Sequence, residues 1–127
     1  MEAVAIVTSA VLVQYMVFAY YVSAARVKHG VAAPATTGHP EFDRVYRVHQ
    51  NTLEQLIIFI PAIWMFAIYV HPLTGAAIGL LFPIGREVYR RSYVADPSRR
   101  AAGAAIGGVS TVTLLIGAAI GAMVSWL

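Results

Sequence analysis

A guanidinium, an amide and a carboxylate recur at helical spacing near the middle of the chain. Arg47, Asn51 and Glu54 stand at positions i, i+4 and i+7, which places them on one face of a helix, with Arg44 one turn earlier. Arginine binds carboxylates through paired hydrogen bonds, and a carboxylate such as Glu54 can hold an ammonium group. This face therefore suits a small zwitterionic ligand with excess negative charge.

A second polar face follows further along the chain. Arg86, Tyr89 and Tyr93 stand at i, i+3 and i+7 of another expected helix. Arg26 ends the first apolar segment and Arg100 begins the last one, so we expect four helices to contribute to one polar layer. Two interpretations stay open: a ligand site, or ion pairs that hold the helices together while other arginines reach lipid phosphates.

The composition places these faces in a membrane. Of 127 residues, 59% are hydrophobic and 12% are charged, which favours one membrane domain over residues 1–127. The net charge of +3 comes without a basic tract in a soluble fold, so we expect no nucleic-acid partner. Cysteine is absent, which excludes thiolate metal sites and a cysteine nucleophile. We predict no metal, and a reactive thiol would have to come from a ligand.

Two uncharged runs are each long enough to span a bilayer, Ala3 to Ala25 and Ala101 to Leu127. The first begins after Glu2 and not after a basic segment, so we expect a retained helix and not a signal peptide. The run from Gln55 to Gly85 holds 31 residues, too many for one span and too few for two. Turn residues from His71 to Gly75 predict a tight hairpin there.

The distribution of basic residues decides between three and four spans. Four spans put all nine lysines and arginines on one side of the membrane, whereas three spans would divide them four against five. We therefore predict an all-α integral membrane four-helix bundle, with spans at about 3–25, 45–70, 73–93 and 101–127. Because the middle helices must extend into charged flanks, polar groups reach membrane depth, where they mark function by default.

Proline and glycine indicate how these helices bend and pack. Pro61 and Pro83 lie inside the middle helices, where each removes a backbone hydrogen bond and can kink the helix. The pentapeptide Gly-Ala-Ala-Ile-Gly begins at Gly75, Gly103 and Gly117, and each copy offers a GxxxG surface for close helix packing.

The stretch Pro-Glu-Phe-Asp-Arg-Val-Tyr-Arg at 40–47, followed by Asn51 and Glu54, resembles the signature of the MAPEG family, the membrane-associated proteins of eicosanoid and glutathione metabolism. Thr36 to Gly38, Trp64 and the series of Arg86, Tyr89, Tyr93 and Arg100 are similar to its leukotriene C synthase and microsomal glutathione transferase branch. The similarity runs without an evident gap from about residue 23 to residue 100.

The resemblance implies a homotrimer that binds its co-substrate glutathione between neighbouring subunits, near the cytosolic surface. It implies seven glutathione-binding residues: Arg26, Arg47, Asn51, Glu54, Arg86, Tyr89 and Tyr93. Arg100 would be catalytic, facing the sulfur and stabilising the nucleophilic thiolate. Lowering a thiol pKa by about two units requires roughly 2.7 kcal/mol, which one desolvated arginine can supply.

Three positions depart from the family pattern. Val27 follows Arg26 where leukotriene synthases have a second arginine, which argues against a dedicated leukotriene role. Gln55 replaces a tyrosine and His49 replaces a glutamine of the relatives, so both are further possible site residues. His49 is either a proton-transfer group or a structural histidine.

These features favour a glutathione transferase, with possible peroxidase activity, that acts on an apolar electrophile or lipid hydroperoxide dissolved among membrane lipids. The alternatives are a non-enzymatic lipid-binding accessory protein and a small transporter or channel. We expect a multi-pass protein of a bacterial inner membrane. Its first and third loops and its active site would face the cytoplasm.

Overall fold

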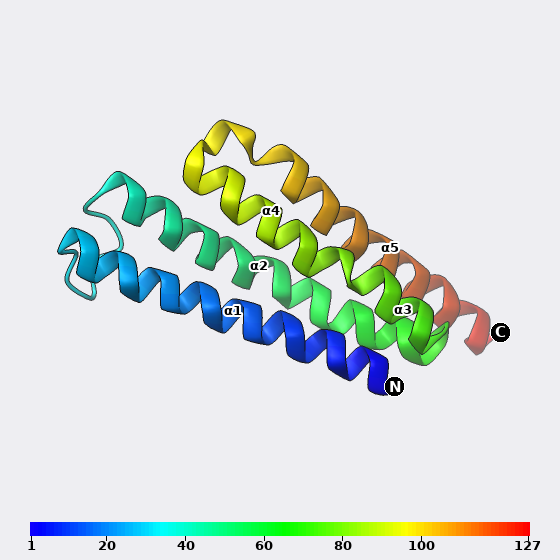
Figure 1. Cartoon of the computed structure of the whole chain (residues 1–127). Helices are drawn as coiled ribbons and strands as arrows, with labels where there is room; N and C mark the ends of the chain where they lie inside the picture. The colour runs from blue at the N-terminus through cyan, green and yellow to red at the C-terminus, as the bar shows by residue number, and fades with distance from the viewer.

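The computed structural model describes residues 1–127 and is almost entirely helical, which confirms the predicted all-α fold. The elements in chain order are α1 (Glu2–His29), α2 (Pro40–Tyr69), α3 (Pro72–Gly79), α4 (Leu81–Ala95), the 3-10 turn η1 (Pro97–Arg99) and α5 (Ala101–Trp126). Figure 1 shows α3 and α4 lying end to end, so the chain forms a bundle of α1, α2, the α3–α4 pair and α5.

Three helical segments are long and apolar enough to cross a membrane: α1, α2 and the segment from Pro97 to Trp126. The chain is therefore a membrane protein. The predicted third span, 73–93, coincides with the α3–α4 pair, whose two helices hold 8 and 15 residues. That fourth crossing stays a prediction, because neither piece reaches the roughly 20 residues of a spanning helix.

Pro83 accounts for the interruption between α3 and α4. A proline has no N–H to donate to the carbonyl four residues earlier, which here belongs to Gly79, the last residue of α3. Leu80 between the two helices keeps right-handed helical angles, so the chain direction is preserved. Pro61 also removes a hydrogen bond, but α2 continues through it unbroken. Of the two prolines, only Pro83 divides its helix.

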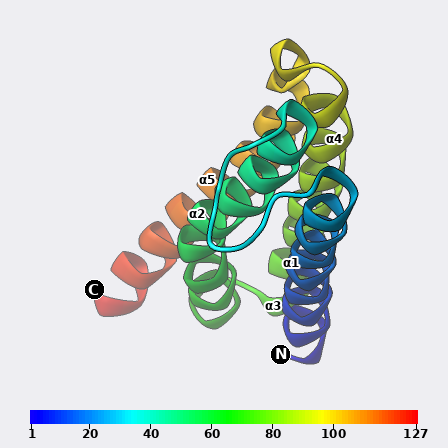
Figure 2. The same ribbon diagram turned by 90° about the vertical axis from the view of Figure 1, so that its left-hand side faces the viewer.

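The hydrophobic core lies along α2, which packs between α1 and α5 (Figure 2). Phe59 and Phe82 are fully buried and their rings stack with centroids 4.1 Å apart, joining α2 to α4. Ile63 on α2, Val11 on α1 and Leu114 on α5 complete this contact without exposed surface. Burial of these side chains holds the helices at fixed positions around the polar residues of α2 and α4.

Glycines bring α5 into backbone contact with its neighbours, as the GxxxG pattern predicted. A Cβ on Gly103 would overlap the backbone of Tyr89, and one on Gly85 would lie 2.5 Å from the amide nitrogen of Gly107. Further along α5, a Cβ on Gly121 would lie 2.7 Å from the carbonyl oxygen of Tyr69. The same face of α5 thus meets α4 near its start and α2 near its end.

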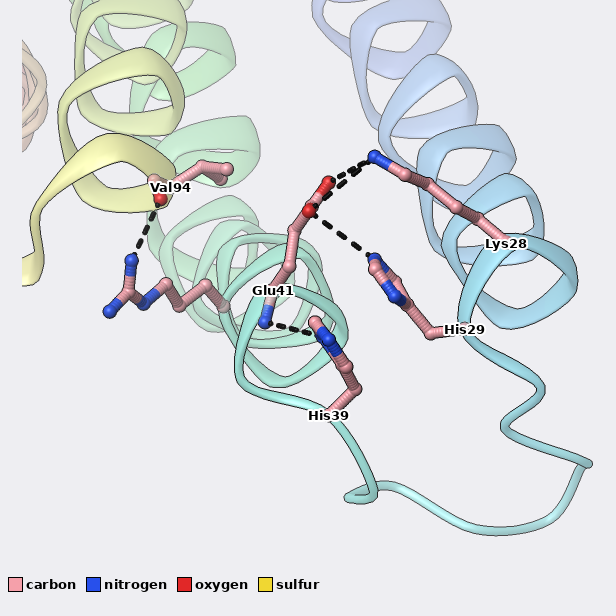
Figure 3. Close-up of polar contacts among 6 residues, drawn as sticks. Lys28, His29, His39, Glu41 and Val94 are labelled. Atoms are coloured by element: carbon pink, nitrogen blue, oxygen red, sulfur yellow. Dashed lines mark hydrogen bonds and ion pairs between the residues drawn. The ribbon is translucent and has the colours of Figure 1, made fainter.

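Side-chain contacts fix the end of the bundle where α1 ends and α2 begins, which we call the charged end (Figure 3). The loop at 30–39 joins α1 to α2, and the Nδ1 atom of His39 accepts a hydrogen bond from the amide of Glu41 at 3.1 Å. The Glu41 carboxylate lies 3.2 Å from the ammonium of Lys28 and 3.3 Å from Nε2 of His29. The rings of His29 and His39 stack at 3.6 Å, which fastens the end of α1 to the start of α2.

The turn between α4 and α5 has its own cap. The Asp96 carboxylate accepts hydrogen bonds from the hydroxyl and the amide of Ser98, at 2.8 and 3.0 Å. These bonds favour the ionised carboxylate and lower the pKa of Asp96 below its ordinary value. The cap fixes the short turn that ends at Arg100.

Candidate active site

A polar cavity of about 200 Å³ lies between α2, α4 and the start of α5. It brings together seven of the residues that the sequence singles out: Arg47, Asn51, Gln55, Arg86, Tyr89, Tyr93 and Arg100. The remaining lining residues are Phe82, Ala104, Gly107 and Gly108. α1 contributes no lining residue, so the cavity draws on three parts of the bundle and not on four as expected.

Helical periodicity explains this convergence. Arg47, Asn51 and Gln55 follow each other at intervals of four on α2, so their side chains project from one stripe of the helix. α5 closes the cavity with small residues. A Cβ on Gly108 would meet no atom within 4 Å, so the room for a ligand exists because α5 presents almost no side chains there.

Arg86 is the most buried charged residue of the site, with 3% of its surface exposed. Its Nε and Nη2 atoms donate hydrogen bonds to the hydroxyl oxygen of Thr52, at 3.2 and 2.9 Å. The Thr52 hydroxyl in turn donates to the carbonyl of Val48 at 2.7 Å. No carboxylate lies within 4.0 Å of the guanidinium, so this buried charge is oriented by a hydroxyl and is not neutralised within the chain.

Two tyrosines continue the arrangement along α4. The guanidinium carbon of Arg86 lies 4.3 Å from the ring centroid of Tyr89, within cation–π range. The rings of Tyr89 and Tyr93 stack nearly parallel, with centroids 5.5 Å apart and an angle of 8° between their planes. The cation and two phenol rings thus form a fixed wall, because each restricts the rotamers of the next.

The electrostatics of the cavity favour an anion. Arg47, Arg86 and Arg100 line it, no lining residue is acidic, and none of the three arginines forms an ion pair. Guanidinium groups in a site sheltered from water bind carboxylates and thiolates more strongly than exposed ones do. The asparagine, the glutamine and the two phenol groups add neutral hydrogen-bonding partners. The site therefore suits a ligand with several negative groups.

Three residues expected at the site lie elsewhere in the single chain. Glu54 is exposed on α2, and its carboxylate forms no ion pair. Arg26 donates to the carbonyl of Ala35 at 2.6 Å and lies over the ring of Phe42, at the loop between α1 and α2. His49 faces α1, away from the cavity. Their roles as ligands stay predictions.

His49 and Arg44 each contact a neighbouring helix and not the cavity. The ring of His49 stacks on Tyr15 of α1 at 4.4 Å, and its buried Nε2 atom has no hydrogen-bond partner. Arg44 does not reach the cavity, although the helical spacing predicts it on the same face as Arg47. It donates to the carbonyl of Val94 at 3.2 Å (Figure 3). It also donates to the carbonyl of Ala95 at 3.5 Å, and so caps the end of α4. Arg44 ties α2 to the turn that carries Arg100.

Sequence reasoning missed the residues that give the cavity its shape. Thr52 lies off the polar stripe of α2 and carries no charge, yet it positions Arg86. The GxxxG pattern predicts only a packing role for Gly107, and Gly108 lies outside that pattern. A hydroxyl beside a charged stripe and a doubled glycine in the facing helix are the signals that identify such positions.

Comparisons with known proteins agree with the resemblance that the sequence carries. Residues 4–120 match the model of the MAPEG family. An uncharacterised protein of Synechocystis sp. is 42% identical over 114 residues, covering 90% of this chain and 83% of the relative. Human microsomal glutathione S-transferase 2 is 37% identical over 106 residues, covering 83% and 72% of the two chains.

A third relative is a leukotriene synthase. Leukotriene C4 synthase of Cavia porcellus is 34% identical over 104 residues, which cover 80% of this chain and 69% of the synthase. The family match spans nearly all of the chain, including every residue of the cavity. The predicted family is confirmed: this chain is a member of the MAPEG family.

Proposed function

We propose that the chain is a membrane-bound glutathione transferase, which activates the thiolate of glutathione for attack on apolar electrophiles. The observation that carries the proposal is the cavity with three arginines and no acidic lining residue. Glutathione has two carboxylates, one ammonium and a thiol, so it supplies the negative groups that this cavity favours. The named transferase and synthase relatives support a reaction of the same class.

The residues divide between binding and chemistry. Arg47 and Arg86 hold the carboxylates, assisted by Asn51 and the phenol groups of the two tyrosines. Arg100, at the start of α5, stabilises the thiolate after the thiol proton leaves to water. The sulfur lone pair then forms a bond to the electrophilic carbon, and the leaving group departs with its bonding electrons. Neither step uses a metal.

A peroxidase reaction requires only a different acceptor. With a lipid hydroperoxide, the thiolate sulfur attacks one oxygen, the O–O bond breaks, and the alkoxide takes a proton. A second glutathione then displaces hydroxide from the sulfur, giving oxidised glutathione and water. The same arginine serves both reactions, because both begin with the thiolate.

The proposal includes a homotrimer, in which neighbouring subunits complete the site. Glu54 lies within the membrane-crossing helix α2 and is exposed in the single chain. An ionisable group at membrane depth is costly when it faces lipid, so a second copy that covers this face lowers the free energy. Arg26, His49 and Glu54 would then contact glutathione across the interface. We place the active site on the cytoplasmic side of a bacterial inner membrane.

The test is a pair of glutathione measurements on the purified full chain in detergent. Glutathione should produce the ultraviolet absorbance of a thiolate, and a dinitrobenzene electrophile should be conjugated. Arg100→Ala should remove both signals. Arg99→Ala is the matched control, because Arg99 is 78% exposed, contacts only Asp96 and lies outside the cavity. Conjugation at the wild-type rate by Arg100→Ala would contradict the mechanism. Fatty-acid binding without glutathione binding would favour an accessory protein instead.

A further inference from the structure

We propose that a second cavity, at the charged end between α1, α2 and α4, binds one membrane phospholipid with an anionic headgroup. This lipid groove has a volume of about 250 Å³ and shares no lining residue with the polar cavity. Its walls are largely apolar, from Phe18, Val45 and Val48, whereas Lys28 and Arg90 line its rim. An apolar groove with cations at one end is complementary to a phospholipid, whose apolar acyl chain is joined to an anionic phosphate.

The groove exists because α1 diverges from α4. Beyond the groove, on the side away from Lys28 and Arg90, Gln14 of α1 donates a hydrogen bond to the carbonyl of Pro83 at 2.8 Å, which holds α1 close to the α3–α4 pair. Towards the charged end, α2 lies between α1 and α4 (Figure 1), and α1 contributes the small residues Ala24 and Ala25 to the wall. Larger side chains would fill the gap.

The rim has unused hydrogen-bond donors for a phosphate. Arg90 directs Nε and Nη2 at Glu87, at 3.0 and 2.6 Å, and its guanidinium lies over the ring of Tyr21, which leaves Nη1 free. Lys28 donates only to Glu41, although an ammonium has three N–H groups. Two cationic donors thus line one cavity mouth, and both are of the type that phosphate prefers.

The charge balance of the rim also fits an anion. The charged residues that line the groove are Lys28, Arg90 and Glu41, whereas Arg91 and Glu87, which pair with each other, lie outside it. Two positive charges against one negative charge leave one positive charge, which the single negative charge of a phosphodiester neutralises. Basic pockets between membrane helices bind anionic headgroups in this way.

The aromatic residues place the rim at headgroup level. Tyr20 is 69% exposed and Tyr21 lies beside it on α1, next to the charged end. Tyrosine is enriched where membrane meets water, because its ring is apolar and its hydroxyl is not. A phospholipid whose phosphate reaches Lys28 and Arg90 would therefore lay its acyl chain towards the hydrocarbon, along Phe18 and Val48.

The lipid groove and the polar cavity share a wall. Phe18 and Val48, on the groove side, pack in one buried cluster with Tyr89, and Tyr93 and Val94 pack against it. Val48 also accepts the hydrogen bond of Thr52, the residue that orients Arg86. A lipid in the groove would pack against the groove side of this cluster and stabilise it. It should therefore strengthen glutathione binding, a consequence that rests on the proposed function.

The experiment uses the full chain in bilayers of phosphatidylcholine that contain spin-labelled phosphatidylglycerol or spin-labelled phosphatidylcholine. The wild type should immobilise the anionic label several-fold more strongly than the zwitterionic one. Arg90→Gln should remove this preference, because the phosphate loses its guanidinium. Ala24→Trp should also remove it by filling the groove without changing any charge. Arg91→Gln is the control, since it removes the same charge from a side chain outside the groove.

Each outcome decides the proposal. A wild type without headgroup preference overturns it, as does a preference that Arg90→Gln and Ala24→Trp both retain. Equal loss in Arg90→Gln and Arg91→Gln, with no effect of Ala24→Trp, also overturns it, because the preference is then a surface charge effect. Glutathione affinity is measured in the same bilayers with and without phosphatidylglycerol. Unchanged affinity overturns only the coupling, whereas absence of glutathione binding in every bilayer contradicts the proposed function.

Discussion

Thr52 and Arg86 form a buried pair in which a hydroxyl, and not a carboxylate, receives two hydrogen bonds from a guanidinium. A carboxylate at position 52 would neutralise the arginine within the chain and leave it little attraction for an external anion. A hydroxyl fixes the direction of the guanidinium but leaves its charge available. The pair therefore combines a rigid side chain with an unsatisfied charge, as a preorganised anion site requires.

Thr52→Val should weaken both the fold and the site. Valine keeps the shape but removes the acceptor, so a buried charged group loses its partner, at a cost of about 1–3 kcal/mol of unfolding free energy. We expect a lower unfolding temperature and a several-fold higher glutathione dissociation constant, measured by thermal denaturation and by calorimetry.

Thr111→Val is the control for that change. Its hydroxyl is also buried but bonds only to the carbonyl of Gly107 in its own helix, at 3.1 Å. It should lower stability without weakening glutathione binding as much as Thr52→Val does. Equal weakening by both variants would show that Thr52 has no special role.

Gly103→Ala should separate α4 from α5. The added Cβ would overlap the Tyr89 backbone, which cannot move aside as a flexible side chain can. Overpacking of this kind costs about 1–3 kcal/mol, so we expect a lower unfolding temperature. Gly108→Ala, whose Cβ meets no atom within 4 Å, should not lower the unfolding temperature. Similar unfolding temperatures for the two variants would contradict the close approach.

Arg44→Ala should loosen the turn between α4 and α5. Arg44 caps the carbonyls of Val94 and Ala95, and a cation at a helix C-terminus contributes about 0.3–1 kcal/mol. Because the turn carries Arg100, we expect faster amide exchange over 94–100 and a higher pKa of the thiol of bound glutathione. Arg91→Ala, which removes a cation bonded only to Glu87, should change neither quantity. Unchanged exchange in Arg44→Ala would exclude the cap.

The cap at Asp96 should depend on pH with a definite sign. Its pKa is lowered in the folded chain by the bonds from Ser98, so the cap is complete above the unfolded pKa of about 3.9 and is lost as pH falls through the folded value. The amide resonance of Ser98, followed by NMR from neutral to acid pH, should therefore titrate with a midpoint below about 3.9. Asp96→Asn should abolish this titration, and a midpoint above that value would refute the cap.

Periodicity predicted which residues share a helix face, but not which side of that face meets a neighbour. At 3.6 residues per turn, Asn51 lies about 40° from Arg47 in one direction and Glu54 about 20° in the other. The cavity takes in Asn51 and extends to Gln55 on its side, whereas Glu54 is left exposed. Only the positions of α4 and α5 decide between these directions, and they depend on long-range packing.

The two prolines illustrate a similar limit. Pro61 and Pro83 have the same local chemistry, and the sequence treats them alike. α2 continues through Pro61 within a long helix packed on both sides, whereas Pro83 divides the short helix pair from Gly79 onward. Local hydrogen-bond loss is equal at both sites, so the difference arises from the surrounding contacts, which a single sequence does not reveal.

The glycine lining of α5 makes the size of the polar cavity adjustable without touching its charges. Gly107 and Gly108 face the arginines and tyrosines across the cavity and contribute only hydrogen atoms. Each carbon added at Gly108 would enter open space and shorten the cavity from that side. Chains with one set of arginines could thus accept ligands of graded bulk, with the limit set on the helix whose only polar side chain in the cavity is that of Arg100 at its start.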